Sequence, residues 1–265
     1  MPSSSSNMSK AEKREAAREQ ARVLREAQAK REKRNRNLII IGIVALIAIV
    51  AVAVYSIVSA GNEKAGQSAI EQVSDVPANS SMADGGISLG SSLVAGTANK
   101  GAPTIDVYLD YTCPHCADFE KINGADVDEL VSTGKATVVY HPIPLLDQSG
   151  DLSGFSGRAV NAAATVADKA PEAYNAFQKA LFALYANATD PNPTGEQIAA
   201  AAVQAGVPQA VADTFTAGTF KDWAKASLEQ FAKDGYRGTP TVLINGKDFE
   251  GWSEKGALAK AVAAA

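Results

Sequence analysis

Residues 104–116 are TIDVYLDYTCPHC, a stretch in which a short apolar run leads directly into two closely spaced cysteines. The β-branched and aromatic side chains at 104–109 are typical of a strand. Residues 117–131 then favour a helix, although their apolar stripe is uneven and Gly124 weakens or kinks it. Residues 136–140, ATVVY, predict a second strand. Strand, helix and strand together predict a right-handed βαβ unit with a parallel pair of strands.

The chain then changes in character, because residues 157–231 are rich in alanine, with Leu, Phe and Tyr at helical spacing. One apolar stripe consists of Tyr174, Phe177, Leu181 and Leu184. Turn-forming residues at Pro171, 190–193 and 206–208 divide this block into several helices. We therefore place a helical insertion at about residues 152–233.

The C-terminal part returns to strands and ends in a helix. Residues 241–250, TVLINGKDFE, are two short runs joined by Asn-Gly, which is a strong hairpin signal. Residues 253–265 predict a final helix that Ser253 caps, with Leu258 and Val262 facing inward. The order βαβ, helices, ββα predicts an α/β, thioredoxin-like fold with a helical insertion, preceded by extra segments.

Charge is divided unevenly along the 265 residues, whose formal net charge is -4. Residues 1–37 contain 11 Lys and Arg and five Glu, a net charge of +6, so the rest of the chain carries −10. A domain so acidic argues against binding to nucleic acid. The basic segment has a thin apolar face. We therefore interpret it as a solvated topology signal rather than a helix that binds anionic lipid or RNA.

Residues 38–58 form a run of 21 residues without a charge. A helix of this length, at ~1.5 Å per residue, crosses a ~30 Å hydrocarbon core. The run is longer than the ~7–15 apolar residues of a signal peptide, so we predict an uncleaved transmembrane helix, with cleavage after Ala60 as the alternative. The basic residues before it predict a cytoplasmic N-terminus and an extracytoplasmic domain at the cell membrane. Residues 59–86 are polar and predict a linker to a globular domain at 87–265.

Cys113 and Cys116 are the only two cysteines of the chain. Between a strand and a helix, this spacing allows a disulfide only if the helix begins at the first cysteine. Unpaired N–H groups and the helix dipole stabilise a thiolate there. His115 adds a donor or a positive charge, and Pro114 loses no hydrogen bond in the first turn. The pattern predicts Cys113 as a low-pKa nucleophile and Cys116 as the shielded resolving thiol.

Three other interpretations of the cysteine pair are weaker. A structural disulfide this short removes little entropy from the unfolded chain. A zinc site needs about four ligands, and the chain offers only the two cysteines, His115 inside the pair and His141, which we expect to be a satisfied loop residue. Two unrelated free thiols are unusual in an oxidising compartment. We therefore expect thiol-disulfide chemistry with no metal and no cofactor.

The motifs DYTCPHC at 110–116 and GTPTVLING at 238–246, separated by a helical insertion, resemble the DsbA family of thiol-disulfide oxidoreductases. The resemblance is to membrane-anchored, single-domain members and covers about residues 87–265. It implies that Pro240 is a cis proline facing the redox-active disulfide and that Thr239 offers its backbone to a substrate strand.

The chain departs from the family at one position that matters for proton transfer. Many members carry a buried acid six positions before the first cysteine, where this chain has Val107. Asp106 is expected to face the opposite side of the strand. Asp110 resembles a recurrent family acid or is simply a residue at the end of the strand, and the pattern favours neither. The proton acceptor for Cys116 is therefore open.

The resemblance and the motif together predict an enzyme that introduces disulfides into unfolded exported proteins. A membrane-embedded partner would reoxidise it, and residues 38–58 would anchor it in the lipid bilayer. A disulfide isomerase or reductase is the first alternative. Family isomerases usually carry a dimerisation domain, for which residues 59–86 are too short and too polar, although Thr239 also occurs before the proline in isomerase-type relatives. A membrane-anchored binding module with an inert cysteine pair is the second alternative.

Overall fold

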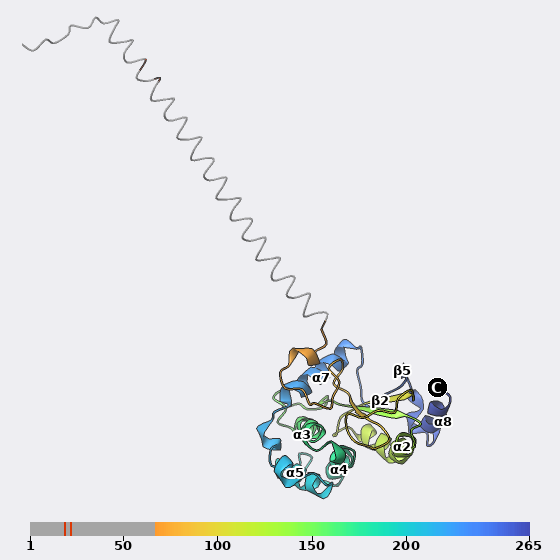
Figure 1. Cartoon of the computed structure of the whole chain (residues 1–265). Coiled ribbons are helices and arrows are strands. Elements are labelled where there is room, and N and C mark those ends of the chain that lie inside the picture. The colour runs from red at the N-terminus through yellow and green to blue at the C-terminus, as the bar shows by residue number, and fades with distance from the viewer. Residues whose placement is uncertain (1–18, 20–21, 23–66) are drawn as a thin grey trace, which may run out of the picture. The chain divides into compact units, whose positions relative to one another are not determined.

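The computed structural model describes residues 67–265, together with Glu19 and Arg22. Glu19 and Arg22 form an exposed ion pair, with Nη2 2.9 Å from Oε1. Residues 67–265 belong to one compact unit in which a mixed sheet lies beside a group of helices (Figure 1). Among the described residues, no helix has both the length and the apolar character required to cross a membrane. The predicted transmembrane helix at 38–58 lies outside them.

The sheet of the described part has five strands in the order β1-β3-β2-β4-β5. They are β1 Ile87–Leu89, β2 Thr104–Leu109, β3 Thr137–Pro142, β4 Thr241–Ile244 and β5 Lys247–Asp248. β2 and β3 run parallel, with Val107 paired with Tyr140, and each other neighbouring pair is antiparallel. The predicted βαβ unit is confirmed, and the chain has a mixed α/β, thioredoxin-like fold.

Helix α2 spans Pro114–Ser132 with Cys113 as its N-cap, as the spacing of the two cysteines predicts, whereas the apolar stripe alone indicated residues 117–131. It runs through Gly124 without interruption. A Cβ at Gly124 would lie 2.3 Å from Glu120 Oε1, so the glycine leaves room for this carboxylate. Burial raises the pKa of Glu120, and Lys179 of the helical insertion, whose Nζ is 3.8 Å away, works in the opposite direction. The ion pair therefore connects α2 to the insertion.

The helical insertion contains five α-helices, of which α3, α4 and α5 lie at the lower left of the domain in Figure 1 and α7 lies above them. They are α3 Phe155–Lys169, α4 Tyr174–Asn187, α5 Gly195–Gln204, α6 Gln209–Ala212 and α7 Lys221–Lys233, with 3-10 turns η2 Pro171–Ala173 and η3 Phe215–Ala217. The helices are interrupted at the predicted breaks. For example, α5 begins directly after the proline-rich turn, and Thr194 and Gln197 form a capping box at its start. In the predicted stripe, Tyr174, Phe177 and Leu181 are fully buried.

β4 and β5 form the predicted hairpin, and its turn residues Asn245 and Gly246 have φ of 52° and 73°. This is the left-handed conformation that Asn-Gly tolerates in a two-residue turn. Asn245 also anchors the hairpin to β2, because its N–H donates to the Thr104 carbonyl and its Oδ1 accepts from the Thr104 N–H, each at 3.0 Å.

The end of the chain differs from the expected single helix. Residues Glu250–Ser253 form the 3-10 turn η4, so Ser253 ends that turn and does not cap the last helix. Helix α8 spans Ala257–Ala263, and its N-cap is Gly256, whose φ of 79° favours glycine. Leu258 and Val262 are buried, as predicted.

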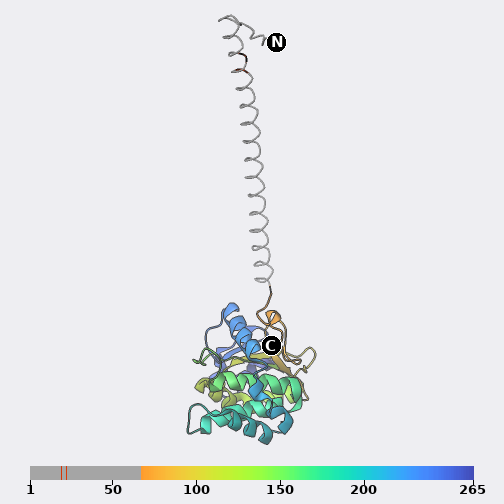
Figure 2. The same cartoon turned by 90° about the vertical axis from the view of Figure 1, so that its left-hand side faces the viewer.

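Residues 67–86 pack on the domain, which differs from the expected linker. Ala69 and Ile70 are buried, and the 3-10 turn η1, Ile70–Gln72, lies beside α7 in both Figures 1 and 2. Strand β1, which the sequence analysis also missed, then adds to β3 at the edge of the sheet. The structured domain of the described part therefore begins about 20 residues before Ile87.

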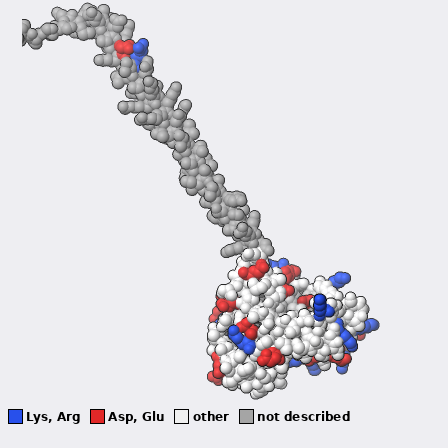
Figure 3. All heavy atoms as spheres, in the orientation of Figure 1, with Lys and Arg blue, Asp and Glu red and all other residues white. Residues whose placement is uncertain are grey.

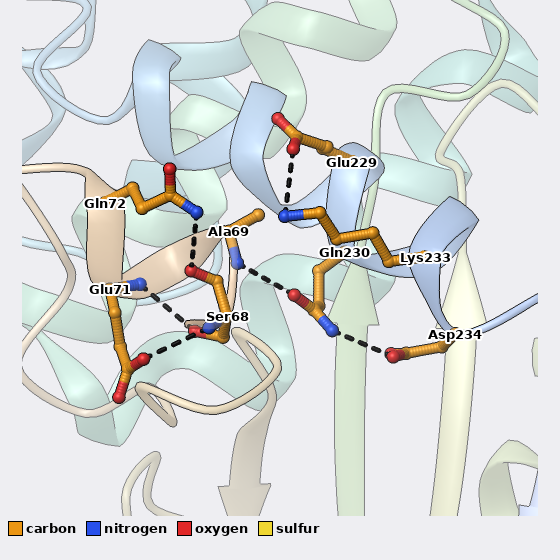
Figure 4. A network of polar contacts seen from close by, with 8 residues as sticks. All are labelled: Ser68, Ala69, Glu71, Gln72, Glu229, Gln230, Lys233 and Asp234. Carbon is orange, nitrogen blue, oxygen red and sulfur yellow. Dashed lines mark hydrogen bonds and ion pairs between the residues drawn. The ribbon is translucent and has the colours of Figure 1, made fainter. Parts of the chain in front are cut away.

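Figure 4 shows the polar network that holds this segment on α7. Ser68 and Glu71 cap the 3-10 turn reciprocally, since each backbone N–H donates to the other's side-chain oxygen at 3.1 Å. The Ala69 N–H donates to Gln230 Oε1 at 2.8 Å, and Gln230 Nε2 donates to Asp234 Oδ1 at 2.8 Å. The Ala69–Gln230 contact joins residues 161 positions apart in the sequence.

Truncation of Ile70 tests whether the segment belongs to the folded domain. We expect Ile70→Ala to lower the free energy of unfolding by about 2–5 kcal/mol, because its fully buried side chain leaves a cavity. Val203→Ala, at a side chain that is 38% exposed, should change it by less than about 0.5 kcal/mol. Denaturant unfolding of both variants provides the measurement. Equal stability of the two would show that the segment does not contribute to the fold.

The two faces of β2 contact different clusters. Val107 joins the main core, whereas Tyr108 belongs to a smaller cluster with Ile143, Phe231 and Leu243. Asp106 lies on the face of Tyr108, as predicted, and its Oδ1 is 3.2 Å from Nε2 of His141. On the face of β2 toward the main core, the position where many family members have a buried acid is therefore occupied by the apolar side chain of Val107.

Candidate active site

The two cysteines lie where β2 gives way to α2. The Cys113 N–H donates to the Asp110 carbonyl at 3.0 Å, which closes the turn between strand and helix. Cys113 has the extended backbone of an N-cap, and Pro114 is the first helical residue. The helix N-terminus thus reaches Cys113, as the spacing predicts.

Both cysteines are free thiols and they differ in their surroundings. The pKa of Cys113 is lowered to about 5, first by a hydrogen bond from the Cys116 thiol and then by donors from Thr239, Cys116 and His115, against the opposing effect of burial. Burial first, and then the neighbouring Cys113, raise the pKa of Cys116 far above its ordinary value. The arrangement therefore favours one thiolate, on Cys113.

The loop before β4 lies against the nucleophile. The Cys113 thiol donates to the Thr239 carbonyl oxygen at 3.2 Å. The Thr239–Pro240 peptide bond is cis, as the resemblance implied. A groove of about 340 Å³ follows the same loop, with Tyr236, Thr241 and Trp252 among its walls. Residues 126 positions apart are thus brought together at one site.

His115 acts through its backbone more than through its ring. Its N–H is among the donors that lower the pKa of Cys113. The imidazole is 73% exposed, and Nδ1 lies 3.9 Å from Asp118 Oδ2. Pro114 is exposed as well, so both central residues of the motif lie on the surface.

Asp110 is fully buried and is more than a strand-end residue. Its Oδ1 accepts from the N–H and the hydroxyl of Thr112, both at 2.7 Å. Its Oδ2 accepts from the Leu146 N–H and the Ser156 hydroxyl, both at 2.8 Å. Four donors offset the cost of burying the carboxyl group. Leu146 and Ser156 were missed in the sequence, where nothing local connects them to the motif.

His141 differs from its expected role, because it lies in β3 and is buried instead of belonging to a loop. Its ring stacks on Tyr108 at a centroid distance of 4.0 Å. Nε2 contacts Asp106, while Nδ1 has no hydrogen-bond partner in the described structure. His141 and His115 do not come together, and no group of three or more His, Cys, Asp or Glu within the described residues could hold a metal ion.

A dithiol at the start of a helix, with a proline loop against it on a thioredoxin-like fold, defines a thiol-disulfide redox site. The family model described as "Thioredoxin" matches residues 90–264, and the chain belongs to this family. A search of curated protein sequences gave no match.

Solved structures similar to this chain are DsbA-like proteins. The MdbA protein of Actinomyces oris, a thiol-disulfide oxidoreductase, is 28% identical over 76% of this chain and 96% of its own, with a TM-score of 0.63. DsbA of Mycobacterium tuberculosis is 28% identical over 67% and 90%, with a TM-score of 0.55. BdbD of Bacillus subtilis, at 16% identity, a TM-score of 0.57 and coverage of 72% and 98%, shares the fold. The resemblance to the DsbA family is thereby confirmed.

Alkylation tests the difference between the two thiols. In the reduced protein at pH 6, iodoacetamide should label Cys113 and leave Cys116 unmodified, because the thiolate is the reactive form. The labelling rate should fall as the pH drops through about 5, the pKa of Cys113. Peptide mapping identifies the labelled residue, and unfolded protein, in which both thiols react alike, is the control. Preferential labelling of Cys116 would refute the assignment.

Proposed function

We propose that this protein is a DsbA-type oxidase that transfers its Cys113–Cys116 disulfide to unfolded, exported proteins. The contrast between the two thiols carries this proposal. A pKa of about 5 makes Cys113 a thiolate at neutral pH, and this stabilises the reduced form relative to the disulfide. A protein whose reduced form is stabilised in this way is a strong oxidant.

The reaction begins when a substrate thiolate attacks Cys113 Sγ in the disulfide. The Cys113–Cys116 bond breaks, Cys116 leaves with the electron pair and takes up a proton, and a mixed disulfide joins Cys113 to the substrate. A second substrate thiolate then attacks the substrate sulfur, and Cys113 leaves as a thiolate. The substrate loses two electrons, which the enzyme holds as its dithiol.

The surroundings of each sulfur suit its step. The high pKa of Cys116, caused first by burial, favours its protonation once it leaves. Donors from Thr239 and from the backbone N–H groups of Cys116 and His115 favour the Cys113 thiolate in the second step. The groove that Pro240 lines follows the loop whose Thr239 carbonyl contacts Cys113, and it offers space for the substrate backbone.

The proposed location is the outer face of the cell membrane, with residues 38–58 in the bilayer and the N-terminus in the cytoplasm. A membrane-embedded partner would accept the electrons of the reduced dithiol. The formal net charge of -4 argues against a nucleic-acid partner. On the face shown in Figure 3, basic side chains are scattered among acidic and uncharged ones and form no basic patch.

Single-turnover oxidation tests the proposed activity. The oxidised full-length protein, in detergent and without another oxidant, is mixed with a reduced, unfolded protein that has two cysteines. We expect one substrate disulfide for each enzyme disulfide consumed. A substrate that stays reduced would contradict the oxidase role. Rearrangement of scrambled disulfides by the reduced enzyme, without net oxidation, would assign it to the isomerases.

Protease accessibility tests the proposed topology. In cells whose wall has been opened, added protease should degrade residues 67–265 and spare an epitope tag placed before residue 30. A permeabilised sample, in which the tag is also lost, is the control. Loss of the tag with survival of the domain would reverse the orientation.

A further inference from the structure

The turn that leads to Cys113 is closed by backbone and side-chain hydrogen bonds, and Asp110 accepts both kinds. Its backbone carbonyl accepts from the Cys113 N–H at 3.0 Å, and its Oδ1 accepts from the Thr112 N–H at 2.7 Å. The Thr112 hydroxyl donates to the same Oδ1, also at 2.7 Å. An aspartate that accepts from the backbone two residues further on stabilises a turn. One residue thus fixes the course of the chain from the end of β2 to the nucleophile.

The second carboxylate oxygen ties this turn to the helical insertion. Oδ2 of Asp110 accepts from the Leu146 N–H and from the Ser156 hydroxyl at the start of α3, both at 2.8 Å. The segments that supply these two donors are joined to each other, because the Gly157 N–H donates to Asp147 Oδ2 at 2.8 Å. The turn is therefore held by an anchor that lies outside it in the sequence.

The carboxyl group is fully buried, and its four donors belong to Thr112, Leu146 and Ser156 rather than to a cysteine. A buried charge is weak evidence for stability, since apolar groups of similar volume are often as stabilising. What a fully satisfied carboxylate contributes is geometry, because its hydrogen bonds hold the donors in one arrangement. The path from this carboxylate to Cys113 runs through the backbone of the turn.

The backbone at Cys113 decides which groups surround its sulfur. Cys113 has φ of −78° and ψ of 119° and is the N-cap of α2. The pKa of Cys113 is lowered first by the Cys116 thiol and also by the backbone N–H groups of Cys116 and His115 in the first turn of α2. These N–H groups can point at the sulfur only while the N-cap keeps its conformation. A change in the turn before Cys113 would therefore move these donors away from the thiolate.

We propose that Asp110 is a positioning residue of the redox site, whose carboxylate holds the turn at 110–113 so that the N–H groups at the start of α2 point at the Cys113 sulfur. The inference rests on the proposed oxidase function and deepens it, because a strong oxidant needs a stabilised reduced form. A carboxylate has about four acceptor sites, and four donors occupy them here. This role is therefore distinct from that of a proton acceptor for Cys116.

Asp110→Asn tests the proposal, because the amide keeps the size of the side chain but cannot accept all four hydrogen bonds. The alkylation rate of Cys113 is measured against pH in the reduced full-length protein. We expect the midpoint of this curve to lie about one pH unit higher in the variant than in the wild type. The equilibrium with glutathione at pH 7 should shift about 10-fold toward the disulfide, because the same loss of thiolate stabilisation enters both measurements.

Asp106→Asn is the matched control, because Asp106 is an acid of the same strand whose Oδ1 lies 3.2 Å from Nε2 of His141 on the opposite face. It should leave both quantities unchanged, and an equal shift in this control would overturn the proposal. An unchanged midpoint in Asp110→Asn would make Asp110 a purely structural residue. A midpoint that moves downward would also contradict the proposal, because it would show that the buried charge repels the thiolate.

Thr112→Val decides the question if Asp110→Asn does not fold. It removes the hydroxyl that donates to Asp110 Oδ1 and retains the N–H that donates to the same oxygen. We then expect a smaller upward shift, seen as an alkylation rate about 2-fold lower at pH 5, and an unchanged rate would refute the proposal. A wild-type protein that oxidises no substrate would contradict the oxidase role, whereas the comparison of variants with the wild type would still decide the role of Asp110.

Discussion

Cys113→Ser is expected to lower the rate of thiol-disulfide exchange by at least about 10³-fold, to the uncatalysed level. Serine has no sulfur to form a mixed disulfide, and Cys116 cannot take over, because it is 1% exposed and its pKa is raised by burial. Oxidation of a reduced, unfolded protein by stoichiometric enzyme gives the rate.

A binding module with an inert cysteine pair would bind its substrate equally well after this change. Substrate capture by the Cys113→Ser variant, measured separately from oxidation, therefore distinguishes the two readings. Circular dichroism of the variant provides the control for folding, since Cys113 is nearly isosteric with serine. Residual exchange within about 10-fold of the wild-type rate would rule out Cys113 as the nucleophile.

Cys116→Ser is expected to convert the protein into a trap. The Cys113 thiolate can still attack a substrate disulfide, but no neighbouring thiol remains to release the product. Mixed disulfides should accumulate to near completion on non-reducing gels, whereas the wild-type protein shows only traces. The double variant Cys113→Ser/Cys116→Ser is the matched control and should capture nothing. Capture by the double variant would show that the complexes are not formed through Cys113.

Local patterns predicted the part of the site that is close together in the sequence. The strand at 104–109 and the start of α2 at Cys113 follow from residue preference and from the geometry of two cysteines. The Asn245–Gly246 turn follows from the left-handed conformation that these two residues accept. The approach of Thr239 to Cys113 came from family resemblance, because no local pattern connects residues 126 positions apart.

Tertiary contacts explain what the sequence did not predict. Ile70 lies in a polar segment typical of a linker, and it is buried only because α7 is positioned beside it. Asp110 was ambiguous, since its donors at Leu146 and Ser156 are 36 and 46 positions away. The final helix was placed too early because Ser253 is a good N-cap, but the chain uses Gly256 after a 3-10 turn.

The reduction potential of the Cys113–Cys116 couple tests the proposed oxidase most directly. The full-length protein is equilibrated with glutathione redox buffers at pH 7, and the fraction of dithiol is measured by alkylation. Stabilisation of the reduced form by the Cys113 thiolate predicts a potential of about −120 to −180 mV, in the range of disulfide donors. A potential near about −270 mV, typical of a reductant, would contradict the account.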